Sequence, residues 1–69
     1  MGADIAITLH MPPNELHALA QFLKRVDYDL CNRLAGVCIT YNGRSEGDTM
    51  WAAVRMVQRQ LAEHGFAPR

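Results

Sequence analysis

An alternating segment that passes through two prolines into an amphipathic helix constrains this chain more than any other feature. Residues 6–26 read AITLHMPPNELHALAQFLKRV. Over residues 4–11, Ile5, Ile7 and Leu9 alternate with small or polar residues, the period-two pattern of a half-buried strand. Pro12 lacks the N–H that a strand ladder requires, so the strand is predicted to end there. The chain is therefore expected to begin with a strand and to continue directly into a helix.

The helix that follows is predicted from Pro13 to about Val26. Pro13 suits the first helical turn, where its missing N–H costs nothing, and Glu15 is favourable near a helix N-terminus. One helical face carries the apolar residues Leu16, Leu19, Ala20, Leu23 and Val26, and Phe22 widens it.

The middle of the chain is predicted to be less regular. Residues 27–29 are expected to bend or end the first helix, because Asp favours caps over helix interiors. A short second helix is expected next, with Gly36 as its C-terminal stop. Residues 37–41 form either a second strand or the tail of an apolar connector, and Asn42 and Gly43 are a turn pair.

A long C-terminal helix is predicted to run to His64. Ser45 and Asp48 have the spacing of a capping-box variant, and Asp48 is itself a competent N-cap. Its core stripe comprises Met50, Val54, Val57 and Leu61. Gly65 is expected to supply a left-handed C-cap, with Phe66 as the accompanying apolar contact. The predicted fold is α+β and mostly helical, in a single small domain over residues 1–69.

Composition narrows the classes of function. Seven basic and seven acidic residues give a formal net charge of zero, whereas nucleic-acid binders usually carry a basic excess. Two cysteines, Cys31 and Cys38, are too few for a disulfide-stapled secreted domain and are interpreted as small buried hydrophobes. No apolar run approaches the length of a membrane span or of a secretory signal. A cytoplasmic protein is expected.

Catalytic and metal sites are not expected. The three histidines, His10, His17 and His64, have no partner at metal-binding spacing, and no nucleophile-elbow, P-loop or dinucleotide-binding motif occurs. The sequence therefore predicts a non-enzymatic protein without cofactor.

The order of strand and helix resembles that of ribbon-helix-helix DNA-binding regulators. In that family, paired N-terminal strands place outward side chains in the major groove. The outward residues here are Asp4, Ala6, Thr8 and His10, and none is an arginine or lysine able to bond guanine bidentately. The resemblance implies a DNA-binding regulator as the alternative function. The zero net charge and the outward residues predict instead that any DNA binding is weak and non-specific.

A second resemblance is carried by ITLHMPPNEL, ALAQFLKRV and LAEHGFAPR, at residues 7–16, 18–26 and 61–69. These segments are similar to those of a family of short, mostly uncharacterised proteins of proteobacterial plasmids, prophages and integrative elements. The resemblance implies an inhibitor of a host defence complex, of the anti-CRISPR type, that binds a host protein and has no catalytic residues.

Two surfaces are predicted from these arguments. Because a lone strand leaves its backbone groups unpaired, a homodimer is expected through the strand that carries Ile5, Ile7 and Leu9. The alternative is that this strand pairs within the chain, with residues 37–41. The middle segment departs from the family pattern, so partner specificity is expected there. The predicted partner-binding residues are Asp27, Tyr28, Asp29, Tyr41, Asn42, Arg44 and Glu46.

Overall fold

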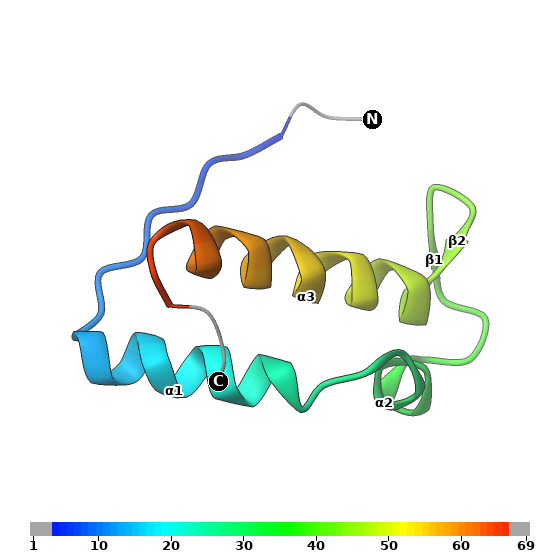
Figure 1. Cartoon of the computed structure of the whole chain (residues 1–69). Helices are drawn as coiled ribbons and strands as arrows, with labels where there is room; N and C mark the ends of the chain where they lie inside the picture. The colour runs from blue at the N-terminus through cyan, green and yellow to red at the C-terminus, as the bar shows by residue number, and fades with distance from the viewer. Residues whose placement is uncertain (1–3, 67–69) are drawn as a thin grey trace.

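The computed structural model of the chain describes residues 4–66 and contains three helices and one small β-hairpin. The helices are α1 (Pro13–Lys24), α2 (Tyr28–Leu34) and α3 (Glu46–Glu63), and the strands are β1 (Thr40–Tyr41) and β2 (Arg44–Ser45). Helices α1 and α3 lie side by side and antiparallel, while α2 crosses near the start of α3 (Figure 1). The mostly helical α+β fold predicted from the sequence is confirmed.

The starts of α2 and α3 follow from local capping. The Asp27 carboxylate accepts a hydrogen bond from the Leu30 N–H at 2.8 Å and begins α2. Ser45 Oγ accepts from the Asp48 N–H at 3.1 Å and begins α3, so Ser45 is the N-cap of that helix. Helix α1 begins on Pro13 with no side-chain cap and ends at Lys24, two residues before the predicted Val26.

The end of α3 is a Schellman motif. Gly65 has a φ of +88°, its N–H donates to the Ala62 carbonyl, and the Phe66 N–H donates to the Leu61 carbonyl at 2.8 Å. The Phe66 ring packs against the core and meets the His17 ring of α1 edge-on, with ring centroids 4.8 Å apart. The predicted roles of Gly65 and Phe66 are confirmed.

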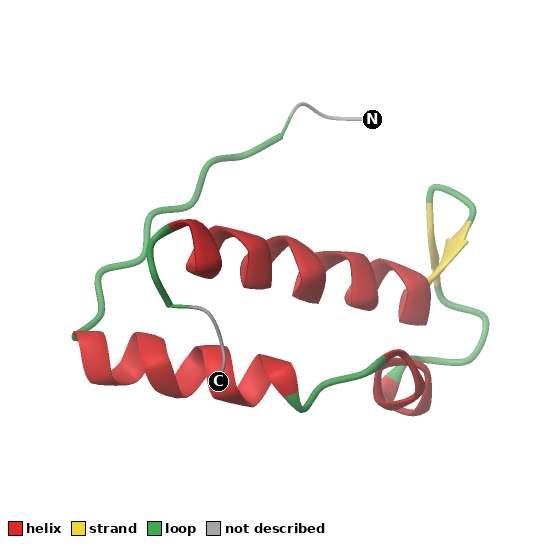
Figure 2. Ribbon diagram, in the orientation of Figure 1, coloured by secondary structure: helices red, strands yellow, loops and turns green. Residues whose placement is uncertain are grey.

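The hairpin joins α2 to α3 and includes part of residues 37–41, for which the sequence allows either a strand or a connector. Thr40 pairs with Ser45 and Tyr41 with Arg44 in antiparallel register, around the turn Asn42-Gly43 (Figure 2). Asn42 and Gly43 both have positive φ, +51° and +81°, which a two-residue hairpin turn requires. Strand β1 thus covers the last two residues of the run 37–41.

The predicted N-terminal strand is not present in the single chain. Residues 4–12 lie outside every helix and strand, and run from the start of α1 past the end of α3 (Figures 1 and 2). Ile5, Ile7 and Leu9 are all exposed. The physical reason is that a strand requires a neighbouring edge, and the hairpin strands pair only with each other among the described residues.

The core is small and lies between α1 and α3. Ala20, Leu23 and Leu61 are buried together, and Leu16, Leu19, Val54 and Phe66 pack against them. Three expected core side chains are instead exposed, namely Phe22, Val57 and Cys38, whereas Cys31 is buried. Two antiparallel helices bury only one stripe each, so residues at the edge of a wide apolar face stay in solvent.

Two further predictions can be compared with the structure. The prediction that Gly36 is the C-terminal stop of α2 is wrong. Helix α2 ends at Leu34, and the next residue, Ala35, is extended with a ψ of 149°. Within the described part of the chain, no helix combines the length and the apolarity needed to cross a bilayer.

Candidate functional site

The predicted partner-binding residues lie at one end of the molecule, where α2 and the hairpin meet the start of α3 (Figure 1). Asp27 and Asn42 have structural roles there, as the cap of α2 and as the hairpin turn. Asp29 in α2 and Arg44 in β2 are exposed. The structure therefore brings together residues that are separated by up to 19 positions in the sequence, from Asp27 to Glu46.

A hydrogen bond joins α2 to the first turn of α3. The Tyr28 hydroxyl donates to Asp48 Oδ1 at 2.5 Å, across 20 residues of sequence. A hydrogen bond to an ionised acceptor is stronger than one between neutral groups. Tyr28 is therefore held in one orientation although its side chain remains exposed. The sequence predicts Asp48 at the helix start but gives no signal for this bond, because the two residues are 20 positions apart.

Glu46 links the hairpin and the connector to α3. Its Oε1 accepts from the Gly36 N–H at 2.7 Å, and its Oε2 accepts from the Tyr41 hydroxyl at 3.0 Å. The carboxylate is partly buried and reaches both segments because α3 begins directly after β2. One side chain thus holds both the connector at Gly36 and the hairpin strand β1 against the start of α3.

The same contact raises the pKa of Tyr41 above its ordinary value near 10. The main cause is the hydrogen bond to Glu46, and the negative charge of that carboxylate adds to it. Both effects disfavour a tyrosinate beside an existing anion.

We expect the pKa of Tyr41 to fall toward the ordinary value in Glu46→Gln. The measurement is an absorbance titration of tyrosinate in a Tyr28→Phe background, where Tyr41 is the one tyrosine of the chain. The hydrogen bond to Glu46 raises the pKa of Tyr41 in the folded state. The stability that this bond contributes is therefore fully present below the pKa of Tyr41 in the unfolded chain, and it is lost as the pH rises through the pKa of the folded state. Glu63→Gln, on the same helix, should leave the titration unchanged. Equal curves for Glu46→Gln and the parent would contradict the contact.

This end also exposes much apolar surface. Twelve large hydrophobic side chains are exposed among the described residues, and five of them fall within residues 28–41: Tyr28, Leu34, Val37, Ile39 and Tyr41. We call these five residues the hairpin-end surface. Leu34, Val37 and Ile39 are not among the partner-binding residues predicted from the sequence, although all three are exposed. Their apolar character pointed to burial, yet Val37 is 91% exposed.

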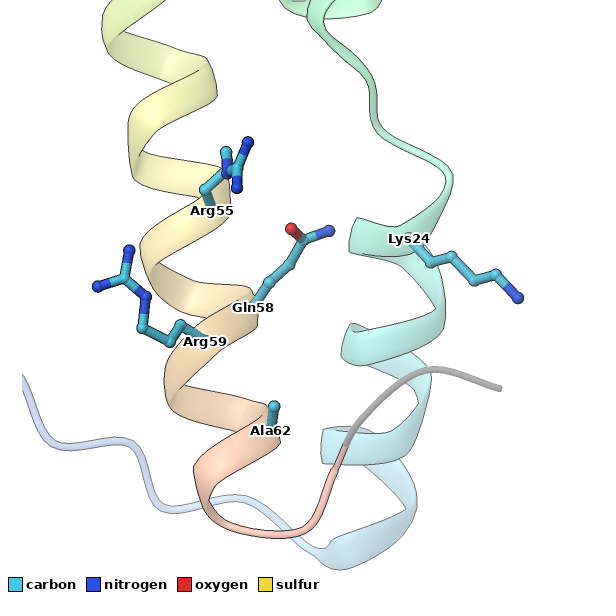
Figure 3. Close-up of a pocket in the computed structure, with 5 residues that line it drawn as sticks. All are labelled: Lys24, Arg55, Gln58, Arg59 and Ala62. Carbon is cyan, nitrogen blue, oxygen red and sulfur yellow. The ribbon is translucent and has the colours of Figure 1, made fainter.

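A second candidate site is an open groove of about 450 Å³ between α1 and α3. It is lined by Lys24, Arg55, Gln58, Arg59 and Ala62. The Gln58 amide bridges the helices by donating to the Leu23 carbonyl at 2.9 Å. Lys24 and Arg59 point away from the space between the helices (Figure 3), and the Arg55 guanidinium lies 5.9 Å from the Trp51 ring centroid. The cations do not converge, so the groove is not a formed anion site.

Residues 4–66 hold no cluster of histidine, cysteine, aspartate or glutamate side chains suited to a metal ion. The structure therefore offers the hairpin-end surface as its best-defined candidate site.

Comparison with known proteins gave one match. Neither the curated proteins nor the solved structures include a match to the chain. The resemblances to mobile-element proteins and to ribbon-helix-helix regulators stay predictions. The family model matches residues 1–69, and the chain therefore belongs to DUF7706, a family of unknown function.

Proposed function

We propose that this protein is a non-enzymatic binding module that docks the hairpin-end surface on another protein. The observation that carries the proposal is the combination of five exposed apolar side chains with hydrogen bonds to α3 that hold the Tyr28 and Tyr41 hydroxyls and the Gly36 N–H in place. Protein interfaces favour aromatic residues and arginine, and a pre-ordered surface loses less conformational entropy on binding.

The charged residues around this surface support specific recognition. Asp29 and Arg44 are exposed beside it and carry opposite charges. Charges at the edge of an interface steer association and reject wrong partners more than they add affinity. We therefore expect the apolar residues to supply affinity and the charged residues to supply selectivity.

The partner class follows from the sequence resemblance. We infer a host defence complex, with a CRISPR effector as the first one to test, and a cytoplasmic location. The two unpaired cysteines support a reducing compartment. The DNA-binding alternative is less well supported, since residues 4–10 offer no arginine or lysine to read a base.

The proposal is tested by expressing the chain in bacteria with active CRISPR immunity and counting plaques of a targeted phage. We expect plating to be restored, and purified effector complex to bind the protein. Val37→Asp and Arg44→Ala should weaken that binding. Val37→Asp should weaken it by about tenfold or more, because an unpaired charge buried in an apolar interface costs at least about 1.4 kcal/mol. Arg59→Ala, an exposed arginine outside this end, is the matched control.

Unchanged plating together with no retained effector would overturn the inhibitor proposal. Binding that is insensitive to Val37→Asp and Arg44→Ala would move the site elsewhere on the molecule. A tight, sequence-dependent DNA shift at physiological salt would favour the regulator instead.

A further inference from the structure

The N-terminal segment, residues 4–11, has an unpaired backbone and an exposed apolar side. Among residues 4–66 the structure records no backbone hydrogen bond made by this segment; the first such acceptor is the Pro12 carbonyl, at the start of α1. Ile5 and Ile7 are 85% and 80% exposed. Leu9 and Met11 continue the same alternating side and are also exposed. A segment with these properties has the side chains of a half-buried strand but no neighbour.

A second exposed apolar area lies on the helix pair, on the side opposite the groove. Two residues along a helix correspond to about 200° around its axis. Phe22 is two residues from Lys24, and Val57 is two residues from Arg55, so both lie away from the groove that Lys24 and Arg55 line. Phe22 is 62% exposed, and Met56 beside Val57 is exposed as well. We call Phe22, Met56 and Val57 the back face.

The flank of α3 that carries the back face is uncharged from Thr49 to Gln60, and Glu46 and Glu63 lie at its two ends. Thr49, Ala53, Met56, Val57 and Gln60 follow one another at three- and four-residue spacing along it. The opposite flank carries Asp48, Arg55 and Arg59. This division is typical of a helix that buries a second stripe against another element.

We propose that a second copy of this chain covers both areas. Residues 4–11 of the two copies would pair as an antiparallel ribbon, with the side that carries Ile5, Ile7 and Leu9 turned onto the back faces. A two-fold axis makes such a contact self-complementary, because apolar positions of one strand then oppose apolar positions of the other. The pairing also satisfies the backbone groups left open in the single chain.

Length and area favour a second copy as the occupant. Eight strand residues span about 26 Å, and the 18 residues of α3 span about 27 Å. A stable interface buries about 800 Å² on each partner. The four apolar side chains of the N-terminal segment and the three of the back face supply an area of that order. The contact is separate from the hairpin-end surface, so it goes beyond the proposed function.

The test is sedimentation of the full chain across micromolar concentrations, with hydrogen exchange on the peptide that covers residues 4–11. We expect a dimer, and slow exchange of those amides that is lost on dilution. Ile7→Asp should weaken dimerisation by about a hundredfold, whereas Thr8→Asp, which puts the same charge on the other side of the strand, should have little effect. Met56→Glu should likewise weaken it, with Ala62→Glu on the groove side as control.

A monomer with freely exchanging amides at all concentrations would overturn the proposal. Equal effects of Ile7→Asp and Thr8→Asp would overturn the stated strand orientation. Circular dichroism keeps these outcomes interpretable, because the N-terminal segment lies outside the core and Ile7→Asp should preserve the helix content. Arg44→Ala should leave the dimer intact, which separates this proposal from the hairpin-end binding.

Discussion

Replacing Leu61 by alanine is expected to lower the free energy of unfolding by about 2–5 kcal/mol, the range for a buried leucine truncated to alanine. Leu61 is 7% exposed and packs with Ala20 and Leu23 at the centre of the core. A chain of this length has roughly 3–10 kcal/mol of stability in total. The loss therefore ranges from about a fifth of the total stability to all of it, and the variant should unfold at a clearly lower temperature.

Urea denaturation followed by circular dichroism at one fixed protein concentration measures this effect. The concentration is held constant because subunit association would shift the apparent stability. The control is Leu34→Ala, the same substitution at an exposed site of α2, which should change the stability by less than about 0.5 kcal/mol. Equal losses in the two variants would contradict the location of the core.

Replacing Gly47 by leucine should have the second-largest effect, with a loss of about 1–3 kcal/mol or more from overpacking. Gly47 is buried in the first turn of α3, where α3 packs against α2. A Cβ atom there would stand 3.2 Å from Asn32 Cα and still closer to the Asn32 side chain. The two helices would have to separate, which would also disturb the Tyr28–Asp48 hydrogen bond.

A double-mutant cycle with Asn32→Ala tests that close approach. Removing the Asn32 amide should relieve part of the penalty of Gly47→Ala and little of that of Gly47→Leu, because the backbone contact remains. Denaturation midpoints of the four alanine-cycle proteins measure the coupling. Strict additivity of Gly47→Ala and Asn32→Ala would show that the two residues are not in contact.

The sequence predicted those parts of the fold that depend on neighbours a few residues apart. Asp27, Ser45 and Gly65 cap their helices as expected, because each acts on backbone groups within about one turn. The turn Asn42-Gly43 was recognisable for the same reason, since its residue types tolerate positive φ. The candidate site was predicted in part: its residues lie together at one end, but the contacts that hold them were not foreseen.

Contacts between distant segments could not be read from the pattern. The Tyr28–Asp48 bond and the two bonds of Glu46 depend on where α2 and the hairpin settle against α3. Apolar residue type also failed to predict burial at Phe22, Cys38 and Val57, which are all exposed. Whether an apolar side chain is buried depends on whether another helix or strand covers its face of the helix. The type of the residue does not determine which faces are covered.

By itself, then, the sequence determined the number and order of the helices, the starts of α2 and α3 and the end of α3, because capping, turn chemistry and apolar periodicity are local properties. The tertiary structure alone decided which apolar faces are covered. The three helices bury one stripe between α1 and α3 and a close contact between α2 and α3 at Gly47. No other element among residues 4–66 covers the N-terminal segment, the back face or the hairpin-end surface. The strand pattern of residues 4–11 was visible in the sequence, but a strand forms only beside another strand, and the single chain supplies none there.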